Sequence, residues 1–182
     1  MNNNTKTVEL STVKNGEIFK VADIEFIKFG EENGRVIAVA MNCIFDSKFG
    51  DNNNLTESKI LSKLENEFLP KIIAEIGEDN ILEVETDLTT LDGLKPYGNM
   101  ISKVSLPTLD FYRQNVEIFD KYMCDEWWWL ATPESAQPHD NPCWVLCVSP
   151  SGRVYDWYCY NNYFGVRPFL HFVSSIFVSC EN

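Results

Sequence analysis

The sequence "VYDWYCYNNYFGVRPF", residues 154–169, has two parts of different character. Its first part places tyrosines, a tryptophan, an aspartate and two adjacent asparagines between positions 155 and 163. A strand buried on one face alternates apolar and polar side chains, and this stretch does not alternate cleanly. The second part, residues 165–168, leads into the apolar run "FLHFV". We therefore expect a strand with an open face, followed by a return of the chain to the core.

The crowded part has the composition of a binding surface. Tyr and Trp offer large, rigid, amphipathic contact area, and Ser, Asn and Arg offer adaptable hydrogen bonds. The alternative is an aromatic-rich core strand, and composition leaves that alternative open. The candidate ligand-binding residues are Trp144, Cys147, Ser149, Arg153, Tyr155, Asp156, Trp157, Tyr158, Tyr160, Asn161, Asn162 and Tyr163.

Three or four further strands are predicted around this stretch. "WWWLATP" (127–133) is typical of a buried aromatic strand, and "CWVLCVS" (143–149) of a second strand. The turn-forming residues of 134–142 predict a loop between them. The run 166–180 predicts one or two closing strands. Within it, Arg167 is expected to form a structural ion pair or to donate to backbone carbonyl groups.

Upstream, the pattern predicts sheet and then helix. Residues 17–45 indicate an antiparallel meander with a hairpin turn at Asn33-Gly34. Apolar residues at helical spacing follow over 58–68, a second short helix is expected over 70–77, and another begins near Thr108. The sequence therefore predicts an α+β fold, in which antiparallel strands at both ends flank two or three short helices.

Length and charge bound the class of protein. The chain of 182 residues is expected to form one domain, 1–182, with a polar segment at 1–15. Its net charge of −12 argues against nonspecific binding to nucleic acid or to an anionic membrane. The sequence has neither the pattern of a signal peptide nor that of a transmembrane helix. We therefore expect synthesis in the cytoplasm, and incorporation into a phage particle remains open.

No motif for catalysis is present. The chain contains six cysteines, and without a secretion signal they are expected to stay reduced. The histidines, His139 and His171, are far apart in sequence, and the cysteines lack the spacing of a zinc site. Asp140 and Asn141 alone do not predict a calcium site. We expect no metal, no cofactor and no enzymatic activity, with a cysteine nucleophile as the remaining alternative.

A resemblance to a known family rests on three segments. "WWWLATP" (127–133), "SGRV" (151–154) and "GVRPFL" (165–170) resemble the closing segment of C-type-lectin-like domains, like those of variable proteins of diversity-generating retroelements and of related gut bacterial and phage proteins. The family pattern is Trp-Trp-Leu-Arg-Ser-Pro, then Ser-Gly-x-Val, then Gly-Val-Arg-Pro. The resemblance covers 16–173, and Ala131 departs from it where the family usually has Arg.

The helix over 58–68 also resembles the family pattern. Ser58, Leu64 and Phe68 match it, whereas Leu61, Lys63 and Glu65 replace its Arg, Trp and Asn.

The resemblance implies a C-type-lectin-like fold in which positions of about 134–163 are diversified. In the family, copying errors at template adenines change the codons of such a segment. An Asn codon can thereby give Tyr, Asp, Ser, Cys, Phe or Arg but not Trp, so Trp144 and Trp157 would be fixed or need another template codon. The implied scaffold residues, held constant, are Trp128, Trp129, Gly165, Val166, Arg167 and Pro168.

The resulting hypothesis is a noncatalytic protein that binds varied protein or glycan ligands through the face at 134–163. One alternative is a structural subunit of a phage tail or fibre that uses the same face for assembly. Another is a cysteine-dependent enzyme of the formylglycine-generating type. The ligand and the oligomeric state do not follow from the sequence.

Overall fold

The structure is a computed structural model that describes residues 5–181. Its strands are β1 (Thr5–Glu9), β2 (Ile18–Val21), β3 (Ile24–Glu32), β4 (Arg35–Ala40), β5 (Ile81–Leu82), β6 (Val84–Asp87), β7 (Asn99–Ser102), β8 (Trp128–Pro133), β9 (Trp144–Val148), β10 (Val154–Tyr158), β11 (Phe169–Val173) and β12 (Phe177–Glu181). Its helices are α1 (Lys59–Lys63), α2 (Leu69–Ile76), α3 (Leu109–Gln114) and α4 (Val116–Lys121). The predicted α+β class is confirmed, as a sheet-rich fold with a few short helices.

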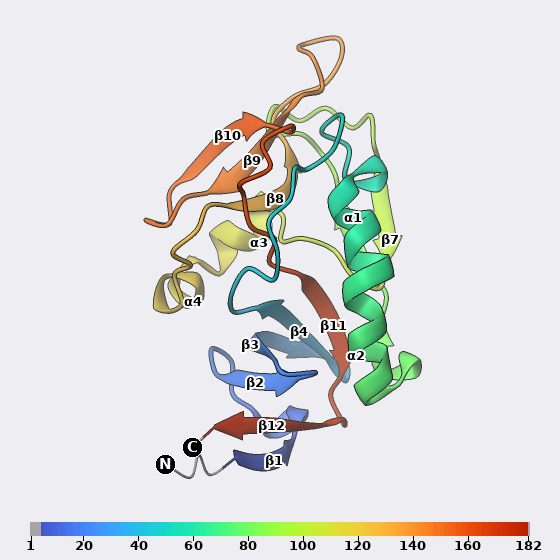
Figure 1. The fold of residues 1–182 in the computed structure, drawn as a ribbon, viewed down its shortest axis with the longest axis vertical. Helices are drawn as coiled ribbons and strands as arrows, with labels where there is room; N and C mark the ends of the chain where they lie inside the picture. Colours follow the sequence, from blue (N-terminus) through green and yellow to red (C-terminus); the bar gives the residue numbers. More distant parts are fainter. Residues whose placement is uncertain (1–4, 182) are drawn as a thin grey trace.

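The named strands form antiparallel sheets. A seven-stranded sheet has the order β1-β12-β2-β3-β4-β11-β5, a three-stranded sheet the order β10-β9-β8, and β6 pairs with β7. Because β1 pairs with β12, the first and last described strands lie side by side at one end of the molecule (Figure 1). The three-stranded sheet lies at the opposite end, and the helices pack along the sides of the molecule (Figure 1). In sequence the helices lie between the strands β1–β4 and β8–β12, as predicted, although the short strands β5, β6 and β7 also fall among them.

The meander predicted over 17–45 is present as β2, β3 and β4. Asn33 and Gly34 both have positive φ, 52° and 76°, as a two-residue hairpin turn requires. The preceding turn places Ala22 and Asp23 at φ of 51° and 59°. This left-handed conformation is unfavourable for residues that carry a Cβ atom.

The helical region differs from the prediction in one respect. The side chain of Ser58 caps α1 by accepting a hydrogen bond from the backbone N–H of Leu61 at 2.9 Å, and Pro70 lies in the first turn of α2, both as expected. The helix is nevertheless not interrupted before Pro70. A π-helical turn over Leu64–Phe68 joins α1 to α2, and the N–H of Leu69 bonds to the carbonyl of Leu64. Through this wider, π-helical turn, the helix continues from α1 to Pro70 in α2 without a break.

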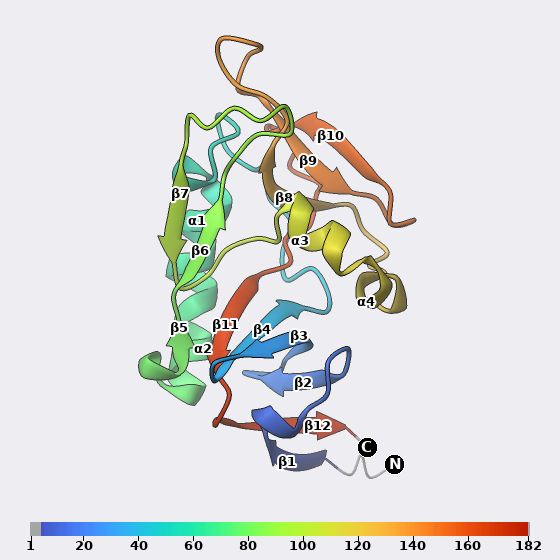
Figure 2. The ribbon, with the colours of Figure 1, turned by 180° about the vertical axis from the view of Figure 1, so that it is seen from behind.

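Two clusters of buried side chains cover the two faces of the large sheet. On one face, the α1–α2 run packs Ile60, Leu64 and Ile72 into the cluster that contains Phe19 and Phe26. On the other, α3 and α4 pack with β8 and β9 in a second cluster. Figure 2 shows α3 and α4 beside the three-stranded sheet, on the opposite side of β11 from α2. Within residues 5–181, every helix is too short or too polar to cross a bilayer.

Candidate ligand-binding surface

Strand β10 is the exposed edge of the three-stranded sheet. It pairs only with β9, in a register that places Val154 opposite Val148 and Tyr158 opposite Trp144. All five residues of β10 are exposed, whereas β9 is buried from Val145 to Val148. The strand predicted with an open face is therefore present, and both of its faces are accessible.

Five exposed side chains define what we call the aromatic surface: Tyr155, Trp157, Tyr158, Tyr160 and Tyr163. Their exposed fractions range from 36% at Tyr155 to 81% at Tyr163. Large exposed side chains that lie together are uncommon on a monomeric protein and mark sites of interaction.

One side of the aromatic surface rests on a rigid base. The ring of the half-buried Trp127 lies 5.1 Å from that of Tyr155 and 6.1 Å from that of Trp157. Trp127 also stacks on the buried Phe164, at 5.4 Å between centroids. Because Phe164 in turn contacts Trp129 in the core, these exposed rings are held in place before any ligand arrives.

The other face of β10 carries a second stack. Tyr158 lies over Trp144 with 3.8 Å between ring centroids and an interplanar angle of 30°. Near the start of the strand, the guanidinium of Arg153 lies 5.4 Å from the centre of the Tyr155 ring. Aromatic side chains thus project from both faces of the edge strand.

The structure places most of the predicted site residues at the surface. The exposed ones are Arg153, Tyr155, Asp156, Trp157, Tyr158, Tyr160, Asn162 and Tyr163, and the half-buried ones are Trp144 and Asn161.

Two of the predicted site residues are not at the surface, and their assignment is corrected here. Cys147 is fully buried, because β9 is the central strand and both of its faces are covered; its thiol contacts the carbonyl of Tyr155 at 3.5 Å. Ser149 is also buried, and it exchanges hydrogen bonds with Arg153 across the turn between β9 and β10. Both residues support the surface without being available to a ligand.

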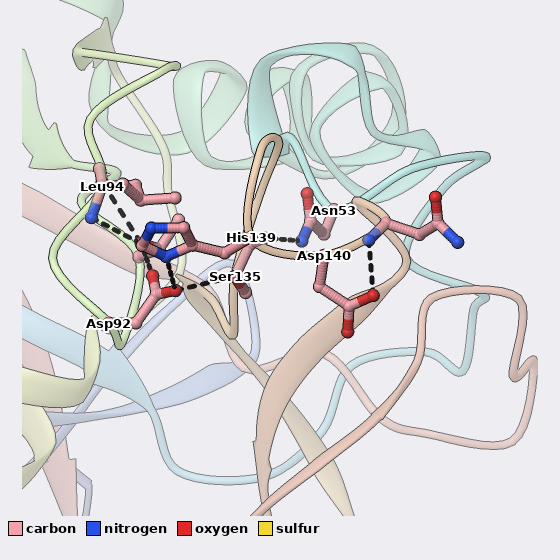
Figure 3. A network of polar contacts seen from close by, with 8 residues as sticks. Asn53, Asp92, Leu94, Ser135, His139 and Asp140 are labelled. Atoms are coloured by element: carbon pink, nitrogen blue, oxygen red, sulfur yellow. Dashed lines mark hydrogen bonds and ion pairs between the residues drawn. The ribbon is translucent and has the colours of Figure 1, made fainter.

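The loop between β8 and β9 is held at both ends by one buried asparagine. The side-chain amide of Asn53 donates to the carbonyl groups of Ser135 at 2.8 Å and Trp144 at 3.0 Å, and its oxygen accepts from the hydroxyl of Tyr97 at 2.7 Å. Figure 3 shows Asn53 beside this loop. The amide therefore joins the two ends of the loop while residues 137–141 remain exposed.

A carboxylate holds the loop from a second direction. Asp92 accepts a hydrogen bond from the hydroxyl of Ser135 at 2.7 Å, lies 2.8 Å from Nδ1 of His139 and also bonds the hydroxyl of Thr90 (Figure 3). Hydrogen bonds from Thr90, His139 and Ser135 hold the pKa of Asp92 well below its usual range. This network connects the 88–98 segment to the base of the exposed loop.

The surroundings of the aromatic surface are acidic. Burial raises the pKa of Glu134, and the nearby charges of Asp156, Asp140 and Asp92 raise it further. These carboxylates create a negative potential beside β10, which favours ligand groups that are positively charged.

The expected scaffold residues are all buried. The side chains of Trp128 and Trp129 point to opposite faces of β8 and enter different core clusters. The backbone of Gly165 forms hydrogen bonds with the residues on either side of Trp128. Its N–H donates to the carbonyl of Trp127 at 2.7 Å, and its carbonyl accepts from the N–H of Trp129 at 3.1 Å. The backbones of Val166 and Pro168 accept hydrogen bonds from Ile44 and Ala40.

Arg167 makes the expected contact with the backbone. Its Nε donates to the carbonyl of Ala40 at 2.9 Å, and its guanidinium lies over the rings of Trp128 and Phe119 at 4.9 and 5.3 Å. The side chain is buried, and Nη2 has no hydrogen-bond partner. Arg167 therefore serves the fold from inside and does not reach the aromatic surface.

The histidines and the strand cysteines do not form a nucleophilic pair. His139 contacts Asp92, and His171 lies 3.3 Å from a guanidinium nitrogen of Arg35. Burial raises the pKa of Cys147 to about 12 and that of Cys159 to about 11, so both thiols are protonated at neutral pH. The arrangement gives no support to cysteine catalysis at these positions.

One cluster of possible metal-binding groups occurs among residues 5–181. Ligand atoms of Cys43, Cys124 and Glu126 all lie within 4.8 Å of one another. Sequence spacing did not reveal this cluster, because Cys43 and Cys124 are 81 positions apart.

A hollow of about 670 Å³ lies at the opposite end of the molecule, between β1, β12 and β2. Its lining includes Lys20, whose ammonium group is paired with Glu181 and Glu25. Because these charges are paired internally and most of the exposed aromatic side chains lie on β10 and the loop that follows it, we place the candidate site at β10 instead.

Searches against family models, curated proteins and solved structures found no match for this chain. The function is therefore inferred from the sequence pattern and from the geometry of the surface.

Proposed function

We propose that this protein is a noncatalytic binding protein with a C-type-lectin-like fold, related to the variable proteins of diversity-generating retroelements. The aromatic surface and the neighbouring loop would contact protein or glycan ligands. The observation that carries the proposal is β10, an edge strand whose five residues are all exposed and whose Tyr155 and Trp157 rings rest on Trp127.

The division between surface and scaffold supports this proposal. Of the residues that a mutated Asn codon can encode, Tyr155, Asp156, Tyr158, Tyr160 and Tyr163 are exposed. Of the tryptophans that such a codon cannot encode, Trp144 on β9 stacks with Tyr158, and Trp157 on β10 contacts Trp127. A constant framework that holds a changeable face is the arrangement that allows binding to vary without loss of the fold.

Assembly is a second candidate function for the same surface. An unpaired edge strand can extend a sheet by pairing with another chain, and β10 is such an edge. In that case the protein would be a structural subunit, for example of a phage tail or fibre. A stable oligomer that buries β10 would favour assembly, whereas an exposed β10 in a monomer favours ligand binding.

The experiment that tests the proposal compares two displayed libraries. In the first, positions 155, 156, 158, 160 and 163 are encoded by Asn codons randomised at their adenines. In the matched control library, positions 128, 129 and 165–167 are randomised to the same extent. Each library is sorted for resistance to protease and then for binding to a panel of unrelated proteins and glycans.

We expect most members of the first library to remain folded and to yield binders to several targets, because the changed side chains lie outside the core. Most members of the control library should fail the protease step. Equal losses of folding in the two libraries would show that the aromatic residues belong to the core, and the proposal would be wrong.

A further inference from the structure

Two cysteine side chains meet in the interior although they come from distant parts of the chain. Cys43 lies in the loop after β4, and Cys124 lies between α4 and β8. Their sulfur atoms are 3.3 Å apart, and both cysteines are free thiols. A disulfide bond has sulfur atoms about 2.05 Å apart. A shift of little more than about 1 Å would therefore bring the two atoms to bonding distance.

The surroundings favour a thiolate on Cys124. The Cys43 thiol donates to it, and backbone N–H groups of Glu126 and Cys43 add further hydrogen bonds. The positive charge of Arg167 acts in the same direction, and together these effects lower the pKa of Cys124 to about 6 although burial opposes them. The Cys43 thiol, as the donor, has a raised pKa and keeps its proton.

The buried guanidinium of Arg167 is the cation that acts on the Cys124 thiol. Its Nη2 has no hydrogen-bond partner. Burial lowers the pKa of Arg167, and the group that opposes this effect most is Cys124. A buried cation is stabilised by a nearby anion, and the Cys124 thiolate is the candidate anion. The same cation repels a divalent metal ion, so the cluster with Glu126 is better suited to thiol chemistry than to metal binding.

We propose that Cys43 and Cys124 form a reversible disulfide that links the loop after β4 to the segment before β8. The oxidant is a low-molecular-weight disulfide. The Cys124 thiolate attacks one of its sulfur atoms, which gives a mixed disulfide and releases one thiolate. Cys43 then loses its proton to solvent and attacks the sulfur of Cys124, which releases the second thiolate. Two cysteines lose two electrons in total, and one disulfide is reduced to two thiols.

The link would lie against Gly165, one of the expected scaffold residues. A Cβ atom built on Gly165 would be 2.2 Å from the sulfur of Cys43, so the glycine leaves the room that the thiol occupies. The neighbouring Ile44 donates to the carbonyl of Val166 at 3.0 Å. Oxidation would therefore fix the loop, the start of β8 and residues 165–166 together. Because the closed loop is long, the melting temperature should rise by about 10 °C.

The test uses the full-length protein in a series of glutathione buffers, from fully reduced to fully oxidised. The expected product lacks the mass of two hydrogen atoms, and peptide mapping joins Cys43 to Cys124. Cys180→Ser, which removes a thiol on β12, should behave like the wild type. Cys124→Ser and Cys43→Ala should each lose the product and the rise in melting temperature.

Three outcomes would overturn the proposal. Both thiols could remain open to alkylation after denaturation of the fully oxidised sample. A different pair, such as Cys143 with Cys159, could account for the entire loss of mass. Finally, Zn²⁺ added under reducing conditions could bind stoichiometrically and protect both thiols, which would identify a metal site instead. All three outcomes are measured on the wild-type protein, so the proposal remains testable even if a cysteine variant does not fold.

Discussion

Replacing Gly165 by alanine should destabilise the protein through one close contact. The new Cβ atom would lie 2.2 Å from the sulfur and 2.6 Å from the Cβ of Cys43. Nonbonded heavy atoms prefer separations of about 3.5 Å or more, so the segments that carry Gly165 and Cys43 must move apart by about 1 Å.

The backbone around Gly165 resists such a movement. Its N–H and carbonyl bond to Trp127 and Trp129, and the next residue accepts a hydrogen bond from Ile44. Overpacking in a well-packed interior typically costs about 1–3 kcal/mol, and because this site is fixed by hydrogen bonds we expect about 3 kcal/mol. For a chain of this length, that corresponds to a fall in melting temperature of about 6–12 °C.

Urea denaturation measures the effect, with the midpoint expected to fall at constant slope. Cys43→Gly removes both clashing atoms, so the double variant should recover about 2 kcal/mol relative to the sum of the single changes. Gly30→Ala is the matched control, because its nearest neighbour is 4.0 Å away and its φ is not positive. A loss below about 0.5 kcal/mol in Gly165→Ala, or no recovery in the double variant, would refute the reasoning.

Three further predictions concern other parts of the fold. Burial, with a smaller effect of Arg35, lowers the pKa of His171 to about 4. Between pH 4 and about 6.5 the unfolded chain therefore binds more protons than the folded chain, and the free energy of unfolding should fall by about 1–2 kcal/mol from pH 7 to pH 5. His171→Asn should abolish this part of the pH dependence, as measured by urea titrations at both pH values. Replacing Ala22 and Asp23 by Asn-Gly should raise the free energy of unfolding by about 1–2 kcal/mol, because both positions have positive φ. Calorimetry measures the change in stability, and an unchanged stability would contradict the strain assigned to this turn. Asn53→Ala should lower the free energy of unfolding by about 2–4 kcal/mol and speed proteolysis within 136–142, because two carbonyl groups of the loop lose their hydrogen-bond donor. An unchanged rate of cleavage would contradict the anchoring role of Asn53.

Local chemistry made the meander and the helix start predictable. A hairpin turn at Asn33-Gly34 needs two residues that tolerate positive φ, and the sequence supplies such residues between two apolar runs. The cap at Ser58 is likewise a short-range interaction. The exposed edge strand was anticipated because aromatic and polar residues failed to alternate. In each case, the responsible residues are adjacent in sequence or lie within one turn.

Features that depend on distant contacts were not predictable in this way. The burial of Cys147 is different, because it lies in the continuous apolar run 144–148, which is typical of a strand covered on both faces. Asn53 stands in the polar run "DNNN", where nothing distinguishes an anchoring amide from a solvated one. The contact between Cys43 and Cys124 spans 81 positions. Strand β7 was not predicted from the sequence; it is four residues long and pairs only with the equally short β6.

The most direct test of the central claim is deep sequencing of the codons for residues 130–168 in a population that carries this gene, together with any nearby near-copy of the segment. The proposed function predicts substitutions at adenine-matched positions between Pro133 and Gly165, concentrated at exposed residues of β10 and its flanking loops. It also predicts that Gly165 to Pro168 are unchanged. An invariant segment without a template copy would contradict diversification, and the aromatic surface would then serve one fixed partner.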